Sequence, residues 1–123
     1  MNKERLTTIA PEIFRKRLIV EGFFGREVGA ETLKEYFAHI TTELGLRSYA
    51  APIVHSTSGP GRDVNQGYDA FVPLVDSGIY IAVWSARRFL STILYTCAEF
   101  DEERAVSLMR DFFELNDHQA TLF

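Results

Sequence analysis

The feature that most constrains the fold of this chain is a series of strand-like segments that follow one another without an intervening helix. Residues 68–75, 79–84 and 92–97 are rich in β-branched and aromatic residues, and short turn-forming stretches separate them. Consecutive strands with few helices are typical of an antiparallel sheet that helices cover on one face. The second half of the chain is therefore predicted to form such a sheet.

Two amphipathic helices are predicted to accompany these strands. Residues 30–44 carry their apolar side chains on one stripe, and Gly45 supplies the helix stop. A second helix begins after Asp101, which has the side chain of an N-cap and is followed by two glutamates that favour the positive helix end. The apolar stripes consist of Leu33, Tyr36, Phe37, Ile40 and Leu44 in the first helix and of Ala105, Met109, Phe112 and Phe113 in the second.

The order of elements is strand, helix, four strands, helix and short strand, which predicts an α+β fold. We expect a two-layer sandwich, with a mainly antiparallel sheet and two helices on one face. The 123 residues suffice for one core, so a single domain over residues 1–123 is expected. The remaining expected elements are a lead-in over 1–12, strands over 14–24 and 47–54, a loop over 55–67 and an edge strand over 119–123.

The uncovered face of such a sheet would need a partner. Five aromatic residues offer more apolar surface than the core requires, which predicts a homodimer. They are Phe23, Phe71, Tyr80, Phe89 and Tyr95.

Charge and composition exclude several classes of function. The net charge of −4 and the lack of any basic cluster beyond Arg87-Arg88 argue against nucleic-acid and anionic-membrane partners. No apolar run is long enough to span a bilayer, and the charged first five residues lack a signal-peptide segment. A single cysteine fits a reducing cytoplasm. The three histidines share no metal-ligand spacing, so no metal is expected.

The segment from Asp76 to Cys97 resembles the small bacterial S-adenosylmethionine (AdoMet) decarboxylases. An acid–serine step opens a strand at Ser77, and Trp84 and Cys97 follow at the family's spacing from that serine. Residues 17–23 are similar to the family's first strand, and the resemblance covers roughly residues 16–115. It implies an AdoMet decarboxylase-like fold and a lyase that decarboxylates AdoMet for polyamine synthesis.

The resemblance also implies a cofactor made from the chain itself. In the family, the serine hydroxyl attacks the preceding peptide carbonyl, an ester forms, and β-elimination cuts the chain and leaves a pyruvoyl group. The pyruvoyl carbonyl forms an imine with the substrate amine and accepts the electrons released on decarboxylation. The cysteine then returns a proton to the substrate carbon. Ser77, Cys97 and Asp76 are thus the catalytic candidates, and pyruvoyl at Ser77 is the expected cofactor if the chain is processed.

Several residues that the family uses are absent. The family histidine lies five residues after the serine, where this chain has Ala82, and a ribose-binding carboxylate four residues further on is replaced by Ala86. Asp69 aligns with a serine that assists processing, and we take it as a substrate-binding candidate. Only Ser77 and Cys97 remain of the chemical set, so we predict little or no cleavage of the chain.

Five further residues are candidates with structural alternatives. His55 opens a glycine-rich loop and is either an exposed loop residue or the missing acid–base group. Glu21 lies in an otherwise apolar strand, where it is either outward-facing or a ligand for a cationic group. Phe23 belongs to the core or faces an adenine ring, and Trp84 belongs to the core, an interface or a ligand site. Arg87 is a solvated turn residue or holds a substrate carboxylate.

Three functions therefore stay open. The leading one is an AdoMet-binding lyase, processed or unprocessed. The second is a cofactor-free enzyme that eliminates or cyclises AdoMet, since its sulfonium is a good leaving group and positioning alone contributes several kcal/mol. The third is a catalytically inactive paralogue that forms a heterodimer with an active enzyme and regulates it.

Overall fold

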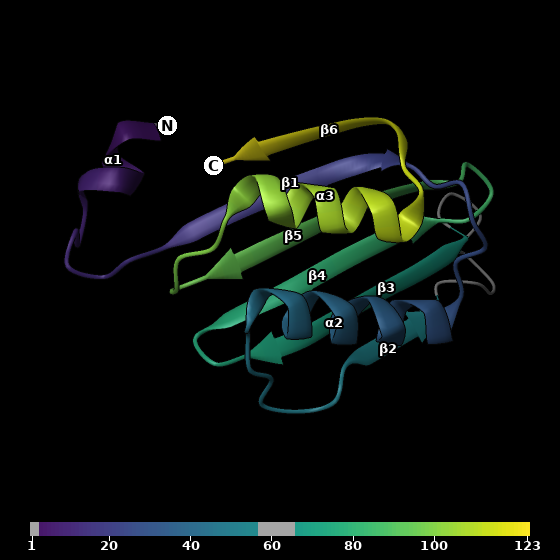
Figure 1. Cartoon of the computed structure of the whole chain (residues 1–123), viewed down its shortest axis with the longest axis horizontal. Coiled ribbons are helices and arrows are strands. Elements are labelled where there is room, and N and C mark those ends of the chain that lie inside the picture. The colour runs from purple at the N-terminus through teal and green to yellow at the C-terminus, as the bar shows by residue number, and fades with distance from the viewer. Residues whose placement is uncertain (1–2, 57–65) are drawn as a thin grey trace.

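Six antiparallel strands form one sheet, which the computed structural model describes within residues 3–56 and 66–123. The strands are arranged in the order β2-β3-β4-β5-β1-β6, so that β1 lies between β5 and β6 (Figure 1). They are β1 (Lys16–Phe23), β2 (Ile53–Ser56), β3 (Gly67–Leu74), β4 (Ser77–Trp84), β5 (Phe89–Thr96) and β6 (Asn116–Leu122).

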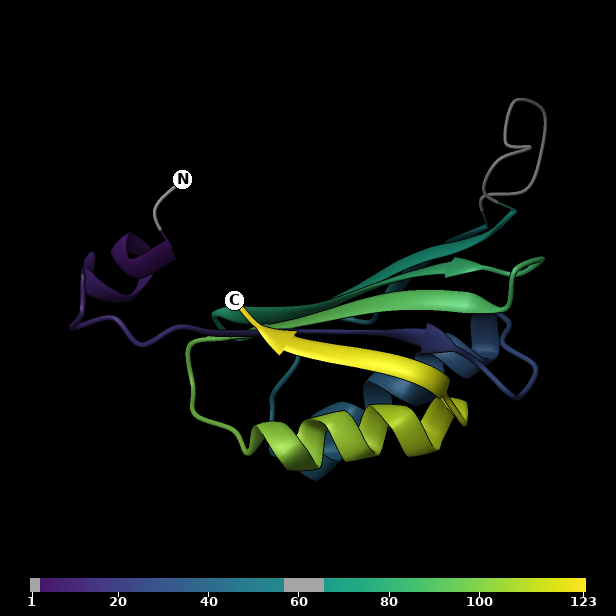
Figure 2. The same cartoon turned by 90° about the horizontal axis from the view of Figure 1, so that it is seen from above.

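Two helices, α2 (Ala30–Leu44) and α3 (Glu102–Phe113), lie side by side on one face of this sheet (Figures 1 and 2). A short helix, α1 (Lys3–Thr8), lies apart from them, beyond the start of β1 (Figure 2). The predicted α+β class, with an antiparallel sheet and two helices on one face, is confirmed. No helix in the described part of the chain has the length and apolar character needed to cross a membrane.

The two covering helices form for the local reasons that the sequence indicates. In α2 the stripe of Leu33, Tyr36, Phe37 and Ile40 is buried, and Gly45 ends the helix at a φ of 67°, which favours glycine. In α3 the Asp101 side chain accepts a hydrogen bond from the backbone N–H of Arg104 at 3.2 Å. The predicted end of α2 at Gly45 and the predicted start of α3 after Asp101 are therefore confirmed.

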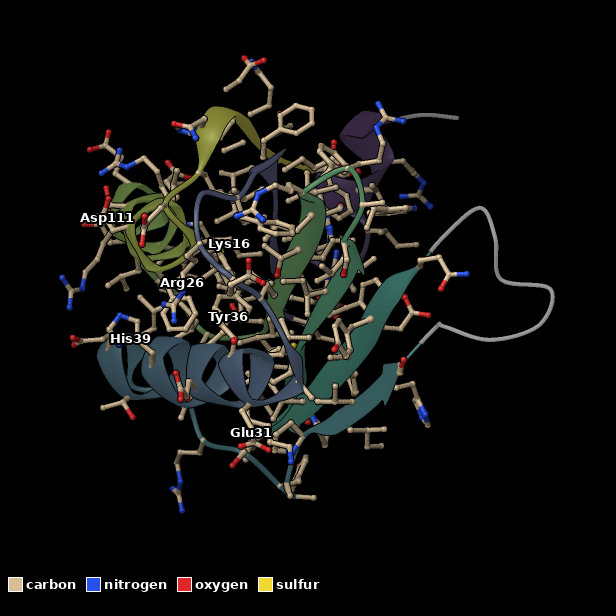
Figure 3. The ribbon with its side chains drawn as sticks, turned by 90° about the vertical axis from the view of Figure 1, so that its right-hand side faces the viewer. Lys16, Arg26, Glu31, Tyr36, His39 and Asp111 are labelled. Carbon is tan, nitrogen blue, oxygen red and sulfur yellow. The ribbon has the colours of Figure 1, made fainter. Side chains whose placement is uncertain are left out.

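A buried chain of hydrogen bonds ties α2 to the centre of the sheet. Tyr36 points from α2 into the space between helix and sheet (Figure 3), and neither it nor Thr92 is exposed to solvent. The Thr92 hydroxyl donates to the Tyr80 carbonyl at 2.9 Å, so the Tyr36 hydroxyl is the donor in its 2.8 Å bond to Thr92 Oγ1. Burial raises the pKa of the Tyr36 phenol above its usual range. The only polar pair deep in the core is thus satisfied within the described residues.

The segment before β2 differs from its prediction. A strand was expected over 47–54, but β2 covers only Ile53–Ser56. The preceding residues follow the sheet edge irregularly, because Pro52 has no N–H to donate and Ser48 makes only an isolated bridge to Leu74. Most of the loop predicted over 55–67 falls on residues 57–65, which lie outside the described residues.

Candidate functional site

The sheet face opposite α2 and α3 carries the candidate site, and we call it the open face. It is formed by alternate residues of each strand, because successive side chains of a strand point to opposite faces. Four of the five predicted surplus aromatics are between 38% and 40% exposed there, and Phe89 is half-buried. The four are Phe23, Phe71, Tyr80 and Tyr95.

A row of mostly polar residues crosses the open face from strand to strand. The pairing register places His55 opposite Asp69, Asp69 opposite Ala82, and Ala82 opposite Ser91. Ser91 is in turn opposite Glu21, and Glu21 is opposite Gln119. We call these six residues the polar row. Three of the predicted site residues, which are far apart in the sequence, are thus brought into one line.

The two carboxylates of the polar row are held by neighbouring hydroxyl groups. Ser91 Oγ donates to Glu21 Oε2 at 2.8 Å, and the Tyr80 hydroxyl donates to Asp69 Oδ1 at 3.2 Å. Burial raises the pKa of the Tyr80 phenol, and the Asp69 charge and hydrogen bond raise it further. Both acids are half-buried and have no ion pair with a described lysine or arginine. They are therefore oriented acceptors available to a cationic group or a hydroxyl.

An aromatic cavity lies beside the polar row, at one end of the sheet. It has a volume of about 280 Å³ and is lined by Phe23, Trp84, Phe89 and Arg87. The Phe89 ring centroid lies 5.2 Å from that of Phe23 and 5.6 Å from that of Trp84. Arg87 is exposed and makes no ion pair with a described acid. Three predicted substrate-binding residues therefore meet here, and we call this cavity the aromatic pocket.

Ser77 and Cys97 meet at the opposite end of β4. Cys97 directly follows β5, and its backbone N–H donates to Ser77 Oγ at 3.3 Å. Asp76 forms the tight turn from β3 with a φ of 53°, a left-handed conformation that aspartate tolerates better than most residues. A shallow cavity of about 290 Å³ exposes this turn; it is lined by Phe71, Asp76, Ser77, Gly78, Tyr80, Ile93 and Tyr95.

The predicted residues thus form two groups at different ends of one sheet. Ala82 lies five residues after Ser77 on extended β4, a distance of about 16 Å, and Trp84 lies about 23 Å from Ser77. A general base must lie within hydrogen-bond reach of the atom that it serves. Asp69, which is opposite Ala82, and His55, which is opposite Asp69, therefore cannot reach Ser77 of the same protomer.

Sequence reasoning missed Ser91 and the site role of Phe89. Both lie on β5 at odd-numbered positions, on the same face as Tyr95, so their alternation was visible in the sequence. Their position beside Glu21 and Phe23 was not, because it depends on the pairing of β1 with β5.

Another cavity, of about 540 Å³, lies between α3 and β6 and contains none of the predicted site residues. Its lining is mixed, with Glu102, Glu103 and Arg110 beside aliphatic groups. We place the site on the open face, where oriented carboxylates and an aromatic pocket coincide. Among the described residues, no group of three or more His, Cys, Asp or Glu side chains is arranged to hold a metal ion.

Comparison with known proteins bears on the fold. No family model and no curated protein matches the sequence. Among solved structures, the chain is similar to the adenosylmethionine decarboxylase from Aquifex aeolicus VF5, with a TM-score of 0.69 and 14% sequence identity. The alignment covers 90% of this chain and 89% of that one. The present chain therefore has the fold of that decarboxylase over nearly its full length.

Proposed function

We propose that this protein is an AdoMet-binding lyase whose site is completed by a second copy of the chain. The aromatic pocket beside the polar row is the observation that carries the proposal, and the shared fold supports it. AdoMet has an adenine ring, a sulfonium, ribose hydroxyls and an amino-acid end. Aromatic rings stack on adenine and attract a sulfonium, oriented carboxylates accept from ribose hydroxyls, and Arg87 matches a carboxylate.

We include a second copy because Ser77 and Cys97 lie at one end of the sheet, whereas the polar row and the aromatic pocket lie toward the other end. A two-fold axis in the plane of the open face, at right angles to the strands, would place the Ser77 end of one protomer over the partner's polar row. Such an isologous contact would also bury the exposed aromatics of both copies. The site would then combine Ser77 and Cys97 with the partner's carboxylates and aromatic pocket.

A pyruvoyl group does not fit the residues present. Its formation needs a proton-transfer group beside Ser77, and the position that supplies one in the resembled family is Ala82, which is 6% exposed between Asp69 and Ser91. Carbon–sulfur cleavage, which needs no pyruvoyl group, is the reaction that we propose. The AdoMet carboxylate attacks its own γ-carbon, the carbon–sulfur bond breaks, and the electron pair leaves with methylthioadenosine. Glu21 and Asp69 would hold the substrate, and Arg87 would orient its carboxylate.

Calorimetry with AdoMet tests the binding site. We expect Trp84→Ala to weaken binding about tenfold or more, because a stacked ring is worth about 1 kcal/mol beyond its buried area. Tyr49→Ala is the matched control, since Tyr49 is 67% exposed and lines neither candidate cavity on the open face. Its affinity should equal that of the unmodified protein. The absence of any binding of the unmodified protein up to millimolar AdoMet would reject the proposal.

Intact-mass spectrometry tests the cofactor. We expect purified protein to keep the mass of the whole chain, because Ala82 stands at the position where the resembled family has its histidine. Ser77→Ala provides the reference for an uncleavable chain. Complete cleavage of the chain before Ser77 would instead support a pyruvoyl-dependent decarboxylase. Release of carbon dioxide without methylthioadenosine would support the same function.

A second function is favoured by the exposed aromatics of the open face: an inactive paralogue that binds an active enzyme. In that case Ser77→Ala and Cys97→Ala should leave biological function unchanged, whereas Tyr80→Ala and Tyr95→Ala should abolish it by weakening association. Complementation scored beside size-exclusion profiles separates the two. Loss of function in Cys97→Ala with the oligomer intact would exclude a role in association alone.

A further inference from the structure

The residues before β1 form a small folded unit, which we call the arm and define as residues 3–15. Its helix α1 is closed by Arg15, whose guanidinium donates to the carbonyls of Leu6 at 2.9 Å, Ile9 at 2.7 Å and Ala10 at 3.1 Å. One side chain thus satisfies three carbonyls in the last turn of α1 and in the two residues that follow the helix. The arm therefore has a defined local shape although it is remote from the core.

The arm presents apolar side chains to the solvent. Its four large hydrophobic residues are between 44% and 53% exposed. They are Leu6, Ile9, Ile13 and Phe14. A cluster of this kind, on a segment whose backbone is already folded, marks an interaction surface.

The position of the arm indicates which surface it meets. The arm leaves the sheet where Lys16 pairs with Thr96, which is the end that carries Ser77 and Cys97. Figure 2 shows α1 on the side of the sheet opposite to α2 and α3, that is, on the side of the open face. The arm extends beyond the sheet at this end. It therefore cannot reach the aromatic pocket of the same protomer, which lies at the opposite end of β4.

Charge favours a second copy as the occupant. Residues 1–15 hold three basic and two acidic side chains, whereas the rest of the chain holds ten basic and fifteen acidic ones. The arm is thus the basic segment of an acidic protein, and the partner's open face carries the carboxylates of Glu21 and Asp69.

We propose that the arm of each protomer packs over the aromatic pocket of its partner and closes the site with its apolar side chains. This inference rests on the two-fold pairing of open faces in the proposed function. In that pairing the Ser77 end of one copy covers the partner's polar row, so the arm that continues beyond this end reaches the partner's Phe23, Trp84 and Phe89. Each site would then be shielded from water by a segment of the other chain.

The only tryptophan of the chain, Trp84, lines the pocket, so its fluorescence reports on this contact directly. We expect Ile9→Glu to raise acrylamide quenching of Trp84 about twofold, because the charged side chain cannot remain on an apolar pocket. Thr8→Glu, which adds the same charge at an exposed polar position of the arm, is the matched control. Circular dichroism should show unchanged folding in both, and Phe14→Glu gives an independent second variant.

Subunit mixing decides whether the contact is made between chains. An excess of Trp84→Phe chains is added to Ile9→Glu chains, so that the only fluorescent pockets face intact arms from the partner. We expect quenching to return to the level of the unmodified protein. Quenching that stays high after mixing would show that the arm acts within its own chain, and quenching that never changes in Ile9→Glu would show that the arm does not cover the pocket. Sedimentation equilibrium and AdoMet calorimetry on the unmodified protein report separately on the dimer and on the proposed function.

Discussion

Replacement of Phe113 by alanine is expected to lower the free energy of unfolding by about 4 kcal/mol, within the range of about 3–5 kcal/mol for truncating a buried aromatic. The Phe113 side chain is fully buried, and its ring centroid lies 4.6 Å from Tyr36 and 4.9 Å from Phe112. It joins α3 to α2 over the centre of the sheet, so the cavity left by alanine would be enclosed on all sides. Urea unfolding with an unchanged m-value measures the loss.

The neighbouring Phe112 provides the matched control for this change. It is the same residue type on the same helix, but it is only half-buried and stacks under the guanidinium of Arg26, which lies 4.9 Å from its ring centroid. Phe112→Ala should therefore cost about 2 kcal/mol or less, because its site opens to water. Equal losses of unfolding free energy in the two variants would contradict the finding that Phe113 is fully buried and Phe112 only half-buried.

The second large effect is expected for Gly67→Ala, with a loss of more than about 3 kcal/mol. A β-carbon at Gly67 would lie 1.9 Å from the Val83 carbonyl oxygen, a backbone atom that cannot move without disturbing β4. Gly67 pairs with Trp84, and the Gln66 carbonyl accepts from the N–H of Ser85 at 2.9 Å. The close approach of β3 therefore also fixes the end of β4 that carries the aromatic pocket.

Gly29→Ala is the control for a glycine that has room for a side chain. The nearest atom to its added β-carbon is the Tyr68 hydroxyl at 3.9 Å, an ordinary contact. Gly29 precedes α2 as the N-cap, so alanine should cost no more than about 1 kcal/mol. Thermal unfolding of the two variants side by side should show a large shift only for Gly67→Ala; a similar small shift in both would mean that β3 can withdraw from β4.

Much of the fold could be predicted because its signals are local. The apolar stripe and Gly45 fix the ends of α2, and Asp101 fixes the start of α3. The failure at 47–54 has a different origin: this segment follows the edge of the sheet, where Pro52 and one isolated bridge replace regular pairing. Whether an apolar segment becomes a strand there depends on tertiary contacts that no local pattern records.

The candidate site could be predicted only in part for the same physical reason. Ser77 and Cys97 are brought together by neighbouring strands of one hairpin, so spacing along the chain was enough. The polar row depends on β1 pairing with β5 across most of the sequence, and the sequence alone does not contain that register. The strand predicted over 79–84 already separates Ser77 from Trp84, whereas the meeting of Phe23 and Phe89 with Trp84 depends on strand pairing that the sequence does not contain.

The position of β1 between β5 and β6 has a consequence for the order in which the protein folds. Strands β2 to β5 pair with their neighbours in sequence and can form as a meander early, whereas β1 must wait for partners made much later in the chain. Contacts of this kind close long loops and slow folding. During synthesis, the apolar residues of β1 would stay unpaired until β5 has emerged, and β6 can join only after that. Folding should therefore begin away from the N-terminus and finish with the first strand of the chain.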